Sequence, residues 1–220
     1  MYLSNKANWL KTVVLCAALA GCASPNPVAY SGLASSAQLA PNPQDHSGRM
    51  PLRYWTPVDW KSYNRLILDP VVIYRDPDNQ FGDMSEADKA SLANYMQARF
   101  AERLRTRFAL ANDAAPDTLR VRLTLTGATT NKPGLSTFTR FDVAGGLYNS
   151  VQAVRGREGM FTGSVIYTVE IYDAADDHLL GAFVSKQYPN AYNIKAGMGS
   201  LAAAKAGIAK GADALVQQMR

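Results

Sequence analysis

The sequence predicts an α+β fold: a two-layer sandwich in which a mainly antiparallel sheet of about four strands carries two main helices packed on one face. Two kinds of pattern lead to this prediction. Some segments alternate between apolar and polar residues, as strands with one buried face do. Two other segments repeat apolar residues every three or four positions, as amphipathic helices do. Packing the apolar stripe of each helix on the apolar face of the strands produces the two layers.

The chain opens with the layout of a secretory signal. Lys6 and Lys11 form a positively charged region before a short apolar run, Thr12 to Ala20, which ends in small residues. The run is well short of the roughly 20 apolar residues that a spanning helix needs. Leu19-Ala20-Gly21-Cys22 resembles a bacterial lipobox, in which a lipid is attached to the cysteine thiol. We expect Cys22 to be the lipidated residue, because bulky Leu15 before Cys16 does not suit the cleavage.

This interpretation divides the chain into three parts: residues 1–21 are a lipoprotein signal peptide, 22–50 a lipidated N-terminus with a flexible tether, and 51–220 a single α+β periplasmic domain. The tether is rich in Ala, Ser, Pro and Asn and poor in charge. Tyr30 to Leu39 is the part of it that could pack on the body as a short arm. Ala23 stands where an aspartate commonly marks inner-membrane retention, which by analogy favours the outer membrane. An ordinary cleaved signal or an uncleaved anchor stays open as an alternative.

Aromatic residues gather at the start of the domain. Tyr54, Trp55, Trp60 and Tyr63 lie within ten residues, and they are typical either of a lid over the core or of a ligand platform. Residues 65–74 should form the first strand, with Pro70 marking an edge or a bulge because proline cannot donate to the ladder.

The first main helix is predicted from Glu86 to Phe108. Ser85 is a suitable N-cap, and a stripe of apolar residues follows at helical spacing. Arg99 and Arg103 lie in its second half, where positive charge suits the helix dipole or an anionic partner such as a lipid or glycan.

The remaining segments complete the sheet and supply the second helix. "TLRVRLTLT" alternates strictly and is the clearest strand. Residues 141–156 should form a short helix that is interrupted near Gly145-Gly146, and residues 161–188 a hairpin around the turn "DAADDH". A C-terminal helix begins near Ser200. Its Gly207 and Gly211 let the helix axis approach a sheet or the other helix closely.

The composition gives little sign of catalysis, and we expect no enzyme, cofactor or metal site. No nucleophile elbow, zinc-protease motif or phosphate-binding loop occurs in the sequence. Asp69 and Glu170 are the carboxylates that burial could activate, although Glu170 should be exposed opposite its apolar neighbours. Asp173, Asp176 and Asp177 could bind calcium but are more typical of a turn.

Charge excludes another class of partner. The whole chain has 23 Lys and Arg against 18 Asp and Glu, and the signal removes two lysines. Nucleic-acid binding needs clustered positive charge, so no nucleic-acid partner is expected.

A family resemblance rests on several of these segments together. The lipobox, "YSGL", "YNRLILDPVVI", "FAERLRTRF", "LRVRLTLT" and "LLGAFVSKQYP" occur in an order and spacing that resembles the DUF3313 family of bacterial lipoproteins. The resemblance implies a periplasm-facing lipoprotein domain of unassigned biochemical role, and it brings no catalytic residues.

We therefore expect an outer-membrane-anchored lipoprotein with a non-enzymatic binding or envelope-assembly and maintenance role. Its partners would be the membrane, through lipid on Cys22, and an envelope protein or an anionic lipid or glycan. The candidate interaction patch is Trp55, Trp60, Arg99 and Arg103. Two alternatives remain: a lipid or glycan carrier with an apolar cavity, and a hydrolase that uses scattered carboxylates.

Overall fold

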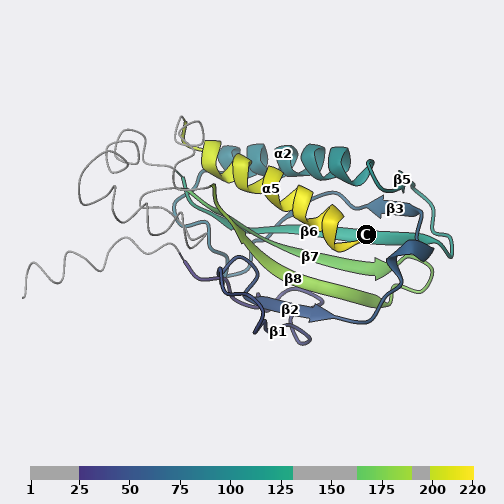
Figure 1. Cartoon of the computed structure of the whole chain (residues 1–220). Coiled ribbons are helices and arrows are strands. Elements are labelled where there is room, and N and C mark those ends of the chain that lie inside the picture. Colours follow the sequence, from purple (N-terminus) through teal and green to yellow (C-terminus); the bar gives the residue numbers. More distant parts are fainter. Residues whose placement is uncertain (1–24, 131–162, 190–198) are drawn as a thin grey trace, which may run out of the picture.

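A computed structural model describes residues 25–130, 163–189 and 199–220, which form one large mixed sheet with two helices on one face (Figure 1). The sheet has eight strands within these residues, in the order β1-β2-β8-β7-β6-β3-β5, with β4 also paired to β6. The helices are α2 (Glu86–Leu104) and α5 (Ala202–Gln218). The strands are β1 (Ala40–Pro41), β2 (Leu52–Trp55), β3 (Arg65–Leu68), β4 (Val72–Ile73), β5 (Ala109–Leu110), β6 (Thr118–Ala128), β7 (Val165–Asp173) and β8 (Leu179–Gln187).

The predicted sheet of about four mainly antiparallel strands is wrong, although the α+β class holds. The run from β6 through β7, β8 and β2 to β1 is antiparallel, but β3 and β4 pair with β6, and β5 with β3, in parallel. Parallel neighbours need a long crossover, and α2 supplies it between β4 and β6. β1, β4 and β5 have two residues each, too few to show any alternation in the sequence.

Pro70 divides the first predicted strand. β3 ends at Leu68, and the chain pairs with β6 again only at Val72, where β4 begins. Proline has no N–H to give to the ladder, so the interruption falls where the sequence indicates an irregularity.

Helix α2 begins where the sequence predicts and ends earlier than expected. The Ser85 side chain accepts a hydrogen bond from the backbone N–H of Asp88 at 3.1 Å, which caps the first turn. Leu92, Met96 and Phe100 are fully buried along one stripe. The regular helix ends at Leu104, and the chain continues through tight turns to the buried residue Phe108.

Helix α5 lies close to the sheet because two glycines face it. A Cβ atom added at Gly207 would lie 2.9 Å from the carbonyl oxygen of Gln187 in β8. One added at Gly211 would overlap the hydroxyl group of Tyr167 in β7. The G-x-x-x-G spacing therefore serves helix-to-sheet packing. No helix in the described ranges is long and apolar enough to cross a bilayer.

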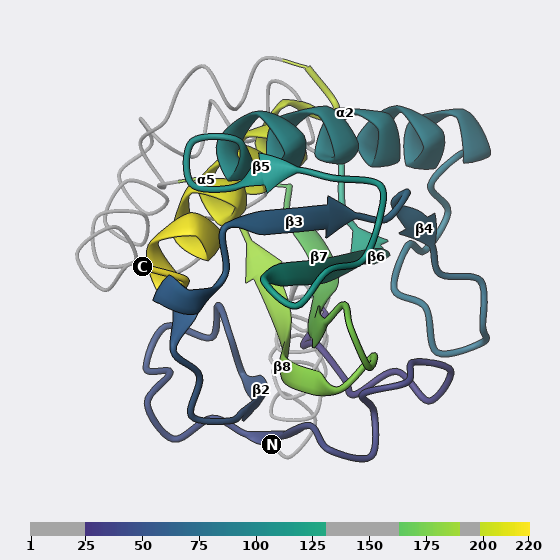
Figure 2. The ribbon, with the colours of Figure 1, turned by 90° about the vertical axis from the view of Figure 1, so that its right-hand side faces the viewer.

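The other face of the sheet is covered by the segment that precedes β2. Figures 1 and 2 show this purple segment on the side of the sheet opposite the two helices. Tyr30 is 1% exposed and packs edge-on against Tyr74, with ring centroids 5.4 Å apart. Ser31 donates to Asp78 through its backbone N–H at 2.8 Å.

This packed segment, which we call the arm, bears on two expectations. The sequence leaves open whether Tyr30 to Leu39 packs on the body, and in the structure Tyr30, Leu33 and Leu39 contact the sheet. Glu170, expected to be exposed, is only 4% exposed, because the arm covers its face of the sheet. The Glu170 carboxylate accepts a hydrogen bond from the backbone N–H of Ser35 at 2.8 Å. The sequence hides this arrangement because the arm has few large apolar residues.

Candidate functional site

An open groove of about 400 Å³ lies where the loop before β2, the edge of the sheet and the second half of α5 meet. Its charged lining residues are Asp45, Arg49, Arg53 and Lys210. Its amide lining residues are Asn42, Gln44, Gln187 and Gln218. The volume falls in the range of about 300–1,000 Å³ that is typical of small-molecule sites. This is our candidate functional site, and we call it the cationic groove.

The loop that forms one wall of the groove is organised by Asp45. One carboxylate oxygen accepts from the backbone N–H and the hydroxyl of Ser47, and the other accepts from the backbone N–H of Met50 at 2.7 Å. Partial burial by itself raises the pKa of Asp45, but the hydrogen bonds from Ser47 and Met50 lower it overall. Asp45 is therefore ionised at neutral pH, and both of its carboxylate oxygens accept hydrogen bonds from the loop itself.

Arg49 is a fixed part of the wall. Its guanidinium donates to the side-chain oxygen of Gln187 and to the carbonyl oxygen of Tyr188, both at 3.0 Å. The same group lies 3.8 Å over the centroid of the Tyr188 ring. Stacking and hydrogen bonding together hold the charge at the end of β8.

Arg53 and Lys210 contribute two further positive charges to the groove. No carboxylate in the described part of the chain forms a salt bridge with either residue. The guanidinium of Arg53 stacks on Trp55 at 4.5 Å, and its Nε atom is shielded from solvent and has no hydrogen-bond partner in residues 25–130, 163–189 and 199–220. Loss of hydration, followed by repulsion from Arg49, lowers the pKa of Lys210.

The side-chain amides that line the groove differ in how many of their hydrogen-bonding atoms are already used. Gln187 accepts from Arg49 through its oxygen and donates to Ser185 through its nitrogen, so both ends of this amide are used. Asn42 donates to the carbonyl oxygen of Met50 and accepts from the backbone of Gln44. Gln218 differs, because its Oε1 atom is shielded from solvent and accepts no hydrogen bond from the described residues.

The predicted interaction patch falls into two separate pairs. Trp55 and Trp60 contact each other with ring centroids 5.2 Å apart, and Trp60 belongs to the core at 8% exposure. Arg99 and Arg103 lie on α2, where Arg99 pairs with Glu102 at 2.6 Å and Arg103 pairs with Asp213 of α5. Within the described residues, no hydrogen bond, ion pair or ring contact joins the tryptophans to these arginines. Trp55 does not line the groove, but its ring contacts Arg53, which does.

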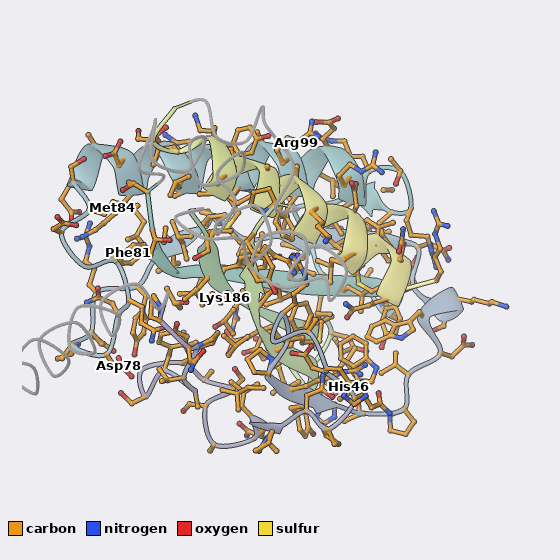
Figure 3. The ribbon with its side chains drawn as sticks, turned by 60° about the vertical axis from the view of Figure 1, so that its left-hand side comes forward. His46, Asp78, Phe81, Met84, Arg99 and Lys186 are labelled. Atoms are coloured by element: carbon orange, nitrogen blue, oxygen red, sulfur yellow. The ribbon has the colours of Figure 1, made fainter. Side chains whose placement is uncertain are left out.

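Figure 3 shows Arg99 at the top of the view, in the helix layer, and His46 near the bottom, in the loop that precedes β2. His46 does not line the groove.

The candidate carboxylates have structural partners. Asp69 pairs with Arg122 at 3.1 Å and lies 3.7 Å from Arg120. Asp173 accepts a hydrogen bond from the hydroxyl of Tyr63 at 2.7 Å, and Asp177 pairs with Arg120 at 2.9 Å. These contacts use the carboxylates to join the β7–β8 turn to neighbouring strands. Among the residues described, no group of three or more His, Cys, Asp or Glu side chains could hold a metal ion.

Three sequence predictions fall outside the described residues: the signal peptide over residues 1–21, the lipidation site at Cys22 and the short helix over residues 141–156. Sequence reasoning missed the cationic groove itself. Its residues come from the loop at 42–50, from β2, from the end of β8 and from α5, which only the fold brings together. One local signal was present, because Arg53 and Trp55 are two positions apart in a strand and so share a face.

The chain resembles several solved structures distantly. A point variant of PelC, a dodecamer from Paraburkholderia phytofirmans, is 11% identical with a TM-score of 0.38, and the match covers 74% of this chain and 93% of that one. A DUF330 protein from Xanthomonas campestris is 11% identical with a TM-score of 0.33, covering 81% and 88%. A hypothetical protein from Chlamydia trachomatis is 9% identical with a TM-score of 0.32, covering 71% and 93%. At such scores nothing about function follows.

Sequence comparison identifies the family. No curated protein matches the chain. The model of DUF3313, described as a protein of unknown function, matches residues 29–215. This match covers most of the chain, including the arm, the eight strands described above, α2 and most of α5, and the chain is therefore a member of the DUF3313 family.

Proposed function

We propose that this protein is an outer-membrane-anchored lipoprotein that faces the periplasm and has a non-enzymatic binding role in envelope assembly or maintenance. The lipobox at Leu19-Ala20-Gly21-Cys22 supports the anchor, and Ala23 favours the outer membrane by analogy. Two acyl chains hold a protein on a bilayer far more firmly than one chain does.

The cationic groove carries the binding part of the proposal. It combines a fixed wall, formed by Arg49 and the Asp45 loop, with two cations that no ion pair neutralises within the described residues. Of the four charged groups that line it, three are positive and one is negative. Such a site favours anionic ligands, because an anion relieves the mutual repulsion of the cations.

The carrier alternative has less support. It needs an apolar cavity between sheet and helices, and the space between α2 and the sheet is filled by Leu92, Met96 and Phe100, each 0% exposed. The hydrolase alternative needs a pair of carboxylates free to transfer protons. Asp69 is engaged by arginines, and Glu170 holds the arm.

The anchor and the binding role are tested by separate experiments. Replacing Cys22 by Ala should abolish palmitate labelling and release the protein from the membrane fraction, whereas Cys16→Ala should leave both unchanged. Crosslinking in the native envelope, followed by mass spectrometry of proteins and lipids, should recover a stoichiometric partner or an anionic envelope component. A lipid-free protein recovered from the cytosol would refute the anchor, and recovery of no crosslinked component would refute the binding role.

A further inference from the structure

Two polar atoms at the cationic groove define what its ligand must offer. Among the described residues, the solvent-shielded Nε–H of Arg53 has no acceptor and the solvent-shielded Oε1 of Gln218 has no donor. Polar groups that lose water without gaining a partner cost free energy, and most such groups in native proteins are satisfied. A ligand that supplied both an acceptor and a donor would satisfy these two residues after small rotations of their side chains.

We infer that the cationic groove binds a hydroxylated anion, namely a carboxylate or phosphate group carried by a sugar. Arg53 and Lys210 contact the anionic oxygens, and Gln218 accepts a hydrogen bond from a neighbouring hydroxyl group. This inference rests on the proposed binding function and names the chemical class of its ligand.

Arg53 is prepared for this role by its position. It lies opposite Phe183 in the pairing of β2 with β8, on the face of the sheet that α5 covers. Stacking on Trp55 restricts the guanidinium and leaves its donors in one plane. A planar set of donors matches the geometry of a carboxylate or phosphate, and charge-assisted hydrogen bonds of this kind are about twice as strong as neutral ones.

Lys210 is held near the groove by the close approach of α5 to the sheet. Gly207 and Gly211, on either side of Lys210 in the sequence, allow the helix to approach β8 closely. This approach brings Lys210 near the end of β8. Arg49 repels the Lys210 ammonium group, so an anion placed between the cations converts repulsion into attraction. Arg49 itself stays in the wall, bonded to Gln187 and Tyr188.

The lining argues against two other ligand classes. Met50 and Ala214 are its apolar side chains, and two such side chains are too few to bury an acyl chain, whose CH₂ groups favour binding only when they are removed from water. No aromatic ring is among the residues that line the groove, whereas single-stranded nucleic acid is bound largely by stacking of bases on such rings.

Titration of the full chain with four small probes tests the ligand class. Glucuronate and glucose 6-phosphate should both bind in calorimetry, inorganic phosphate should bind several-fold more weakly than glucose 6-phosphate, and glucose should not bind measurably. Equal binding of glucose and glucuronate would show that charge is not recognised. Equal binding of phosphate and glucose 6-phosphate would show that the hydroxyl groups are not recognised. Either result overturns the inference.

Variants test the assigned residues. Arg53→Gln and Lys210→Gln should each weaken glucuronate binding at least tenfold, and Arg53→Lys should lose less than Arg53→Gln because it keeps the charge. Gln218→Leu should remove the preference for glucose 6-phosphate over phosphate. Lys205→Gln is the matched control on the same helix, since Lys205 packs over Tyr95 and does not line the groove. If Arg53→Gln and Lys210→Gln bind glucuronate as tightly as Lys205→Gln does, the assignment is wrong.

The same variants separate this inference from the proposed function. If the envelope crosslinking recovers the same partner from the Arg53→Gln variant as from the unaltered protein, and the sugar anions do not bind, the inference fails while the binding role stands. If the sugar anions bind but crosslinking recovers no envelope component, the proposed function fails and the ligand class stands. Urea unfolding of each variant checks that the fold is retained.

Discussion

The substitution Gly211→Ala measures how closely helix α5 approaches the sheet. In a helix that touched nothing, replacing Gly by Ala would stabilise the protein by about 1 kcal/mol. Here the new methyl group would overlap the hydroxyl of Tyr167 and lie 2.9 Å from its Cζ atom. Tyr167 is 1% exposed and packs edge-on against Phe100 at 5.7 Å, so its ring has little room to move.

The expected result is a net loss of stability. Overpacking a core costs about 1–3 kcal/mol, and the depth of this overlap places the cost near the upper end. After subtraction of the helix-propensity gain, Gly211→Ala should lower the free energy of unfolding by about 2 kcal/mol. For a protein of this size that corresponds to a decrease in Tm of roughly 4–8 °C. Urea unfolding followed by circular dichroism measures the free energy, and calorimetry measures the Tm.

A double-mutant cycle with Tyr167→Phe isolates the contact. Removing the hydroxyl group removes the deepest overlap, so Gly211→Ala should cost about 1 kcal/mol less in the Tyr167→Phe background than in the unaltered protein. Ala206→Gly calibrates the propensity of the same helix at a half-buried position and should cost about 1 kcal/mol. A Gly211→Ala protein that is more stable than the original, with no coupling to Tyr167→Phe, would refute the close approach.

Three further predictions concern the arm, the first helix and the groove loop. Ser85→Ala should lower the free energy of unfolding by about 1 kcal/mol in urea, because a helix cap is lost, whereas Ser85→Asp should retain it. Burial raises the pKa of Tyr30 to about 12. The stability that the protonated phenol contributes to the fold is therefore fully present below pH 10 and is lost as the pH rises to about 12. Between pH 10 and about 12, the free energy of unfolding of Tyr30→Phe should therefore fall by roughly 2–3 kcal/mol less than that of the unaltered protein, as measured by urea unfolding. An equal fall in both proteins would contradict burial of the phenol. Asp45→Ala should speed amide hydrogen exchange at Met50, whose N–H the carboxylate accepts at 2.7 Å, and unchanged exchange would show that the loop does not depend on Asp45.

The sequence was informative where a segment is long and periodic. α2, α5, β6 and the β7–β8 hairpin all show a period that survives in the fold, because each presents an apolar face to the core between helices and sheet along many residues. Strands of two residues show no period, and their parallel pairing depends on contacts far apart in the chain. The sheet was therefore predicted too small and too antiparallel.

Contacts between distant segments explain the other differences. Glu170 alternates out of the core in sequence, yet the arm from residue 30 onward buries it by covering the second face of the sheet. The cationic groove depends on the distance between α5 and the end of β8, which no local pattern encodes. The aromatic cluster points to Trp55, whereas its stacking partner Arg53 was missed although it lies two positions before Trp55 in the same strand.

The arm has a mechanical consequence if Cys22 carries lipid. Tyr30 is fixed on the sheet, so only eight residue steps connect the acylated cysteine to the folded body. Even when fully extended, the segment from Cys22 to Tyr30 spans about 28 Å, at 3.3–3.6 Å per residue. The folded domain could then rotate near the membrane but could not move far from it. It could bind only partners that lie close to the leaflet in which the lipid is inserted.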